Sequence, residues 1–183
     1  GTIAMLEAAR AAGVAAFVHV SSSEVYGASG TGALGEDAPT RPTTPYAEAK
    51  LAAEAHARAA HAAGGMRIMI LRPFNAYGPR CHHEGDAGEV IPKFLLRALA
   101  GRPLTIFGDG EQTRDFTWVE DTAAGIAAAE AAPGAAGQTI NLGSGRAVTI
   151  NALAALAARA ARRPIEIAHA DPRPGDTPHL RAD

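Results

Sequence analysis

The chain of 183 residues is 47% hydrophobic and carries a formal net charge of −2 at pH 7. This hydrophobic content supports one domain with a core, or two small lobes, and argues against global disorder. The mildly acidic balance argues against a nucleic-acid or anionic-membrane binder, and no apolar run is long enough to span a bilayer. Residues 1–13 lack the layout of a signal peptide and the single cysteine, Cys81, fits a reducing compartment, so we expect a cytoplasmic protein.

Helix-like and strand-like segments alternate along the chain. In chain order we predict a helix over 3–12, strand 15–22, helix 45–63, strand 66–73, a loop over 77–88, helix 90–100, strands 103–108 and 114–119, helix 120–132, strand 137–143, helix 149–162 and strand 164–170. Gly13 ends the first helix, Thr44 and Pro45 are expected to start the second, and Thr149 is the expected cap of the last.

This alternation predicts an α/β fold with parallel strand pairing. In such sheets ligands bind beyond the carboxyl ends of the strands. The loops that begin at Ser21, Pro73 and Gly108 are therefore the expected positions of a site.

Tyr46 and Lys50 stand four residues apart on the predicted helix, so their side chains share one face. An ammonium group beside a phenol stabilises the phenolate, which can accept a proton from a substrate hydroxyl while hydride leaves the same carbon. Such a pair alone is also common on solvated helix faces. The upstream stretch VSSSEVYG favours the catalytic interpretation, because its serines would emerge at the same edge of the sheet.

A series of motifs covers nearly the whole chain: SSSEVYG, PYAEAK, LRPFNAYGPR, IPKF, LTIFGDGEQTRDFTWVEDTA, INLGSG and RPGD. In this order and spacing they resemble the NAD-dependent nucleotide-sugar epimerase/dehydratase family, the extended short-chain dehydrogenases. The resemblance implies NAD as cofactor, a nucleotide sugar as substrate and a homodimer; the absence of a nucleic-acid or membrane partner is expected from the composition instead. It also implies the carboxyl-terminal part of a Rossmann-like parallel sheet, with a smaller α/β substrate-binding lobe.

The resemblance assigns a role to individual residues. The catalytic residues it implies are Ser22, Glu24, Tyr46 and Lys50. The cofactor-binding residues it implies are Tyr46, Lys50, Pro73 and Phe74. The substrate-binding residues it implies are Ser23, Asn75, Glu89, Val90, Thr105, Phe107, Arg114, Arg173 and Asp176. Two arginines on separate loops suit a diphosphate, because guanidinium groups form charge-assisted bonds to phosphate.

Compared with the family, the chain starts at the helix before the catalytic-serine strand, so the glycine fingerprint for NAD is expected upstream of Gly1. The glycine stretches 27–32 and 143–145 lack the context of that fingerprint. By the resemblance, residues 1–80 are the remaining dinucleotide-binding domain with the Ser/Tyr/Lys site. Residues 81–183 are mainly the substrate lobe, with about 115–142 returning to the first domain. We expect the isolated chain to bind NAD weakly and not to turn over.

The reaction stays open at this point. Family members begin by oxidising the sugar at C4, and an epimerase then returns hydride to the other face of the ketone. A 4,6-dehydratase or a decarboxylase needs a further acid or base, and the pair Ser23-Glu24 resembles that of decarboxylases and mannose-type dehydratases. We favour an epimerase with a UDP-sugar-like substrate, with those two reactions and a non-catalytic sugar-nucleotide binding module as alternatives.

The stretch CHHEGDAGE, residues 81–89, groups potential metal ligands. Its spacings match no structural zinc pattern, and His82 and His83 are adjacent on an irregular loop. We expect no metal site and interpret the stretch as a polar lid over the sugar site.

Overall fold

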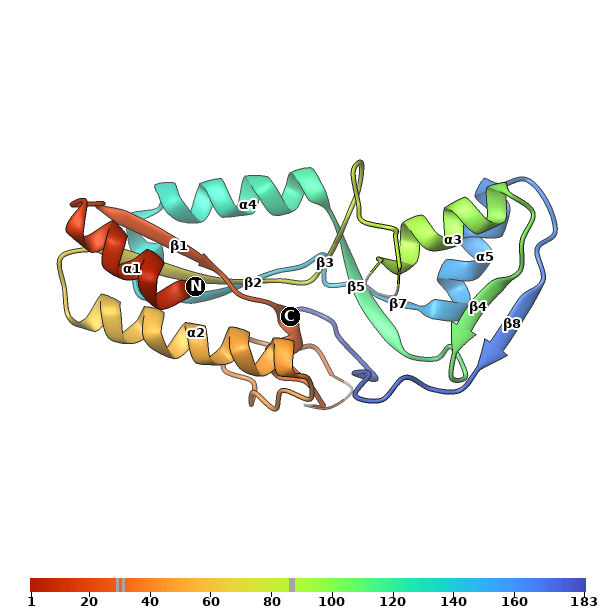
Figure 1. Ribbon diagram of the computed structural model, residues 1–183, viewed down its shortest axis with the longest axis horizontal. Helices are drawn as coiled ribbons and strands as arrows, with labels where there is room; N and C mark the ends of the chain where they lie inside the picture. The colour runs from red at the N-terminus through yellow and green to blue at the C-terminus, as the bar shows by residue number, and fades with distance from the viewer. Residues whose placement is uncertain (29, 31, 86–87) are drawn as a thin grey trace.

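The computed structural model describes residues 1–28, 30, 32–85 and 88–183 (Figure 1). In chain order the described elements are α1 (Thr2–Ala11), β1 (Ala16–Val20), η1 (Ser23–Tyr26), α2 (Pro45–Ala62), β2 (Arg67–Pro73), β3 (Asn75–Tyr77), α3 (Val90–Leu99), β4 (Leu104–Phe107), β5 (Thr113–Trp118), α4 (Val119–Ala131), η2 (Pro133–Ala135), β6 (Thr139–Leu142), β7 (Ala147–Thr149), α5 (Ile150–Ala160) and β8 (Ile167–Ala170). No helix among them is long and apolar enough to cross a membrane.

One end of the molecule, which we call the sheet lobe, is a parallel sheet in the order β1-β2-β6. Helices α1 and α2 cover one face and α4 covers the other (Figure 1). The middle strand β2 is buried along most of its length, because helices cover both of its faces. Its continuous apolar run follows from this position, since neither face needs polar side chains.

The opposite end, which we call the small lobe, contains α3, α5 and the parallel pair β4-β8 (Figure 1). Its core lies where the two helices pack on β4. The buried core residues are Phe94, Ala98, Leu104, Ile106, Ile150, Leu153, Ala154 and Ala157.

Three strands, in the order β3-β5-β7, join the two lobes. The pairs β1-β2, β2-β6, β3-β5 and β4-β8 are parallel, as expected, whereas β5 pairs antiparallel with β7. The reason is the direction of travel: β5 enters the sheet lobe, whereas β6 and β7 leave it (Figure 1). Neither β3 nor β7 was predicted, and β3 takes Tyr77 out of the predicted loop.

The carboxylate of Asp115, a fully buried residue of β5, holds two distant segments together. It accepts hydrogen bonds from the amides of Ser144 (2.8 Å), Gly145 (2.9 Å) and Ala182 (3.1 Å), and from the Ser144 hydroxyl (2.6 Å). The 143–145 glycine stretch therefore donates its N–H groups to a carboxylate within the chain. In the other glycine stretch, Ser29 and Thr31 lie outside the described residues.

The predicted helix caps of α2 and α5 are confirmed. The Thr44 hydroxyl accepts from the amide of Ala47 at 3.2 Å, and the Thr149 hydroxyl accepts from the amide of Ala152 at 3.0 Å. Each cap satisfies one of the amides that a helix start leaves without an intrahelical partner. The start of α2 matters here because Tyr46 lies in its first turn.

Candidate active site

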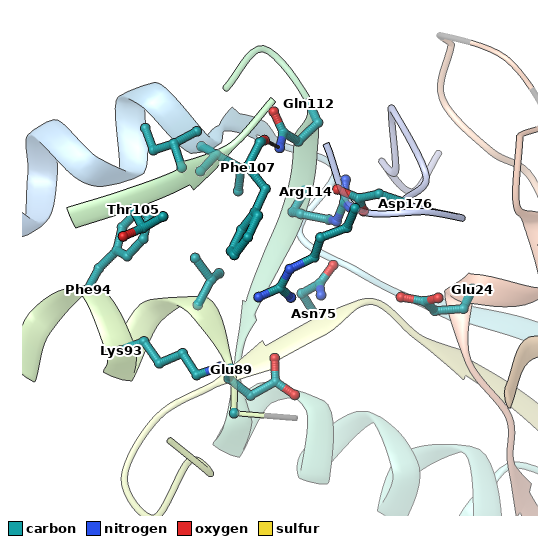
Figure 2. A pocket seen from close by; sticks show the side chains of 15 residues that line it. Glu24, Asn75, Glu89, Lys93, Phe94, Thr105, Phe107, Gln112, Arg114 and Asp176 are labelled. Carbon is teal, nitrogen blue, oxygen red and sulfur yellow. Dashed lines mark hydrogen bonds and ion pairs between the residues drawn. The ribbon is translucent and has the colours of Figure 1, made fainter. Parts of the chain in front are cut away.

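A cavity of about 290 Å³ lies between the two lobes. Figure 2 shows Glu24 at one end, Thr105 and Phe94 at the other, and Asn75 and Arg114 between them. The cavity brings together all but one of the residues that the sequence predicted for substrate binding, with one predicted catalytic residue. These are Glu24, Asn75, Glu89, Val90, Thr105, Phe107, Arg114, Arg173 and Asp176.

Two arginines, Arg114 and Arg173, contribute to the lining of the cavity. Arg114, whose side chain is only 11% exposed, forms an ion pair with Asp176. The guanidinium carbon of Arg173 lies 4.0 Å from the centre of the Phe107 ring, a cation–π contact. The two arginines come from β5 and from the loop after β8, so the cavity presents cationic groups from separate segments to one space.

Glu24 is the acidic side chain at the sheet-lobe end of the cavity (Figure 2). Burial raises the pKa of its carboxyl above the ordinary value, Arg114 opposes that rise, and the charges of Asp176 and Glu89 add to it. A carboxyl group whose pKa moves toward neutrality is suited to exchange protons with a bound ligand.

The cavity also contains residues that the sequence did not single out. They are Gly88, Lys93, Phe94, Ile106, Gln112 and Ile150. Lys93 and Phe94 belong to the motif IPKF, and Gln112 belongs to the motif LTIFGDGEQTRDFTWVEDTA. The family motifs could therefore have identified these three residues as part of the site. Ile106 and Ile150 are also part of the small-lobe core, which shows that this core supplies the apolar floor of the cavity.

Tyr46 and Lys50 do lie close together on α2, but they do not line this cavity. The Lys50 Nζ atom is 5.7 Å from the centre of the Tyr46 ring and donates a 2.9 Å hydrogen bond to the carbonyl of Val20. Tyr46 is 55% exposed, so its phenol is open to a ligand from solvent. This hydrogen bond fixes the Tyr46–Lys50 pair to Val20, the last residue of β1.

The remaining predicted residues lie at the carboxyl ends of β1 and β2, outside the cavity lining. Ser22 and Ser23 are buried, and the Ser22 hydroxyl accepts a 3.2 Å hydrogen bond from the amide of Glu24. Pro73 ends β2, and Phe74 is buried against Tyr26, with ring centres 6.3 Å apart. Ser22 therefore sets the turn that directs Glu24.

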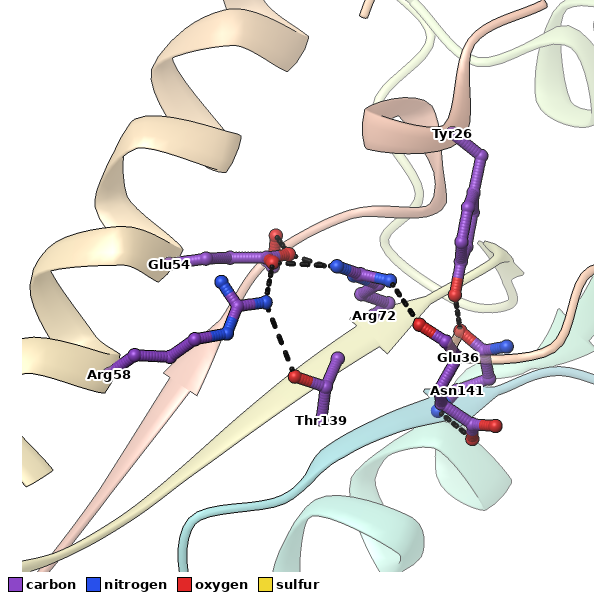
Figure 3. Close-up of polar contacts among 8 residues, drawn as sticks. Tyr26, Glu36, Glu54, Arg58, Arg72, Thr139 and Asn141 are labelled. Atoms are coloured by element: carbon purple, nitrogen blue, oxygen red, sulfur yellow. Dashed lines mark hydrogen bonds and ion pairs between the residues drawn. The ribbon is translucent and has the colours of Figure 1, made fainter. Parts of the chain in front are cut away.

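A buried polar network supports this arrangement (Figure 3). The Glu54 carboxylate accepts from the Ser21 hydroxyl (2.6 Å), from Arg72 (2.9 and 2.8 Å) and from Arg58 (2.7 Å). The Arg72 guanidinium also lies 4.8 Å from the centre of the Tyr26 ring. The network thus joins α2, the end of β1, β2 and η1, which are the elements that carry Tyr46, Lys50, Ser22 and Glu24.

Of the stretch 81–89, Gly88 and Glu89 are in the lining of the cavity. Within the described residues no three His, Cys, Asp or Glu side chains are grouped so that they could hold a metal ion. Asp86 and Ala87 of the stretch lie outside the described residues.

Known proteins similar in sequence to this chain include an epimerase and a dehydratase. Over 184 residues the chain is 38% identical to the UDP-glucose 4-epimerase of Mycolicibacterium smegmatis, covering 100% of this chain and 58% of that protein. It is 37% identical to a dTDP-glucose 4,6-dehydratase of Streptomyces griseus, covering 88% of this chain and 48% of the relative. The chain thus spans about half the length of these relatives.

A solved structure agrees with the sequence relatives. The UDP-glucose 4-epimerase of Thermus thermophilus, solved as a complex with NAD, superimposes with a TM-score of 0.90 at 33% identity, covering 100% of this chain and 60% of that one. The family model that describes the NAD dependent epimerase/dehydratase family matches residues 1–143. The chain therefore belongs to the NAD-dependent epimerase/dehydratase family.

Proposed function

We propose that the chain carries the substrate-binding and proton-transfer residues of an NAD-dependent nucleotide-sugar epimerase. The observation that carries this proposal is the convergence of Arg114, Arg173 and Phe107 on one cavity. The guanidinium groups suit a diphosphate, and Phe107 with the apolar floor suits a flat base. The sugar would then point toward Glu24, at the other end of the cavity.

The proton step falls to residues at the carboxyl end of β1. The phenolate form of Tyr46, which the Lys50 ammonium stabilises, accepts the hydroxyl proton at its oxygen and becomes a phenol. Lys50 donates one N–H to the Val20 carbonyl, so it keeps N–H groups for a ribose hydroxyl or the phenol. Ser22 is the proposed hydroxyl partner of the sugar oxygen, and Ser23 and Asn75 are proposed to contact the substrate.

The residues of this chain fit one end of an NAD molecule. The exposed phenol of Tyr46 and the ammonium of Lys50 supply the donors and acceptor that a nicotinamide ribose needs, and Pro73 and Phe74 would lie beside its ring. The chemistry that bound NAD supplies is reversible hydride transfer at a sugar carbon. The 143–145 glycines cannot cradle its phosphates, because Asp115 takes two of the amides in that stretch, so we propose that this chain alone binds NAD weakly.

Glu24 supports a second candidate, a 4,6-dehydratase or decarboxylase. Such reactions need a further proton donor or acceptor near the sugar, and burial raises the pKa of the Glu24 carboxyl at that end of the cavity. A non-catalytic sugar-nucleotide binding module is the third candidate, and it would need the cavity but not Tyr46.

We also propose the division into domains at about residue 80. The pairing of β6 with β2 supports the return of about 115–142 to the first domain. A homodimer through α1 and α2 is proposed as well, and the exposed Ile3 and Met5 of α1 support it.

Calorimetric titration of the chain with UDP tests the binding site. We expect Arg114→Met to weaken UDP binding by about 10- to 100-fold, since a hydrogen bond to a charged group contributes roughly 1.5–3 kcal/mol. Arg159→Met, on an exposed part of α5, is the control and is expected to leave affinity unchanged. Equal affinity for UDP and uridine would contradict the assignment of the two arginines.

The reaction is tested in a chimera in which the upstream NAD-binding segment of a family member precedes this chain. It is incubated with UDP-glucose, UDP-glucuronate and GDP-mannose. A 4-epimer supports the epimerase, whereas carbon dioxide or a 4-keto-6-deoxy sugar supports the second candidate. If Tyr46→Phe leaves turnover intact, the proton-transfer role is wrong.

A further inference from the structure

The loop after β8, residues 171–178, which we call the strap, returns from the small lobe to the sheet lobe (Figure 1). It carries Arg173, which stacks on Phe107, and Asp176, which pairs with Arg114. Between these residues, Gly175 reaches the start of α2, where its carbonyl accepts a 3.0 Å hydrogen bond from the Thr43 hydroxyl. One short segment therefore contacts both the cationic cavity wall and the helix that carries Tyr46.

Gly175 lies close to the start of α2 in a backbone conformation that favours glycine. Gly175 has a φ of +75°, and a Cβ placed on it would lie 3.2 Å from the Thr43 carbonyl oxygen and 3.6 Å from the Thr44 methyl carbon. Both the conformation and the space disfavour a side chain. The strap thus lies directly on the residues that begin α2.

Those residues set the first turn of the helix. Thr44 is the N-cap: its hydroxyl accepts from the amide of Ala47 at 3.2 Å, and its carbonyl accepts from the amide of Glu48 at 3.0 Å. Tyr46 lies within this turn and is 55% exposed, whereas its neighbour Ala47 is fully buried. Helix ends with few contacts fray, and their order depends on the cap.

We propose that Thr43 and Gly175 are positioning residues that transmit occupancy of the cavity to the first turn of α2. The proposal rests on the proposed function, because it takes a nucleotide diphosphate as the occupant. A diphosphate held by Arg173 and a ribose hydroxyl held by Asp176 would restrict the strap on both sides of Gly175. The Gly175 carbonyl then stays in place for Thr43, and the turn that holds Tyr46 becomes more ordered when substrate is bound.

Hydrogen exchange of the backbone amides of Ala47 and Glu48, with and without saturating UDP, tests the proposal. In the unmodified chain we expect UDP to slow their exchange by about fivefold or more, the lower end of typical coupling between two sites. Thr43→Val removes the hydroxyl at nearly constant shape and is expected to abolish this slowing. Thr43→Ser is expected to restore it, and Thr40→Val, on the same loop, is expected to leave it unchanged.

Calorimetry on the same variants separates this proposal from the proposed function. Coupling is reciprocal, so Thr43→Val is expected to weaken UDP binding by at most the factor by which UDP slows exchange. UDP that binds but slows exchange equally in Thr43→Val, or not at all in the unmodified chain, overturns the positioning role and leaves the binding site standing. No UDP binding by the unmodified chain contradicts the proposed function, and the positioning role with it.

Discussion

Glu54 has no exposed surface, and its carboxylate accepts two hydrogen bonds, of 2.9 and 2.8 Å, from the guanidinium of Arg72. The pair joins the helix of Tyr46 and Lys50 to the strand that ends at Pro73. Burial alone would raise the pKa of Glu54, but the hydrogen bonds from Arg72 and Ser21 outweigh it and hold that pKa below the ordinary value.

Removing one partner of this pair should be costly. We expect Arg72→Met to lower the free energy of unfolding by about 3–5 kcal/mol, because it leaves a buried carboxylate without its main partner. Arg58→Met removes the 44%-exposed partner of the same carboxylate and is expected to cost at most about 1 kcal/mol. Urea unfolding measures both values, and the double variant Glu54→Leu/Arg72→Met should recover part of the loss. Equal costs for the two arginines would be inconsistent with the network described.

Glu24 and Glu54 should respond to pH in opposite directions. The pKa of Glu24 is raised in the folded chain, so ionising it costs stability as pH rises from about 4.5 through that higher pKa. Glu24→Gln is therefore expected to be more stable than the unmodified chain at pH 7, with the difference vanishing at acidic pH. The pKa of Glu54 is lowered, so its contribution is present above pH 4.5 and is lost as pH falls through the folded-state value.

Thermal unfolding between pH 3 and pH 8 measures both profiles. Glu130→Gln, on an exposed part of α4, is the control and should leave the profile unchanged. A Glu24→Gln variant that is less stable than the unmodified chain at pH 7 would show that the carboxylate is not desolvated there.

The ion pair of Arg114 with Asp176 should limit the affinity of the cavity for anions. Asp176→Asn removes a negative charge from the position next to the proposed diphosphate, so inorganic pyrophosphate is expected to bind more tightly, on the order of tenfold in low salt. UDP should gain less, because we propose that Asp176 also accepts a hydrogen bond from a ribose hydroxyl of the nucleotide. Asp171→Asn, at the start of the strap and outside the cavity lining, serves as the matched control in calorimetry. A gain of equal size for both ligands would argue against the ribose contact.

Gly27 should tolerate no side chain. It follows η1 with a φ of +52°, and a Cβ on it would lie 1.7 Å from the Arg41 carbonyl oxygen. Gly13 has a similar φ of +68° but open space around it, so Gly13→Ala reports the conformational cost alone, about 1–2 kcal/mol. Gly27→Ala is expected to cost clearly more in thermal unfolding, because the backbone at Arg41 must move. Similar costs for the two variants would mean that the loop adapts freely.

The sequence predicted best those features that depend on burial of a whole strand or on local capping chemistry. The run MRIMILRP predicted a buried strand because helices on both faces leave β2 no need for polar residues. Thr44 and Pro45 located the start of α2 to the residue, because capping chemistry is local. The resemblance of the motifs to a family named most residues of the cavity in advance.

Other features depend on contacts that no local pattern reveals. The three-residue strands β3 and β7 are too short to show a period, and the antiparallel pairing of β7 follows from the path of the chain. The pairing of Arg114 with Asp176 joins residues that are 62 positions apart, and their separate motifs gave no sign of it. The spacing of Tyr46 and Lys50 predicted their proximity, but not that Lys50 would donate to the Val20 carbonyl.

The carboxylate of Asp115 holds together the chain segments that connect the two lobes. Its partners at Ser144, Gly145 and Ala182 come from two other chain passages, and β5 itself is a third. Three passages of the chain therefore meet at one fully buried carboxylate. Loss of this carboxylate would therefore leave the amides of Ser144, Gly145 and Ala182 without their acceptor at the same time.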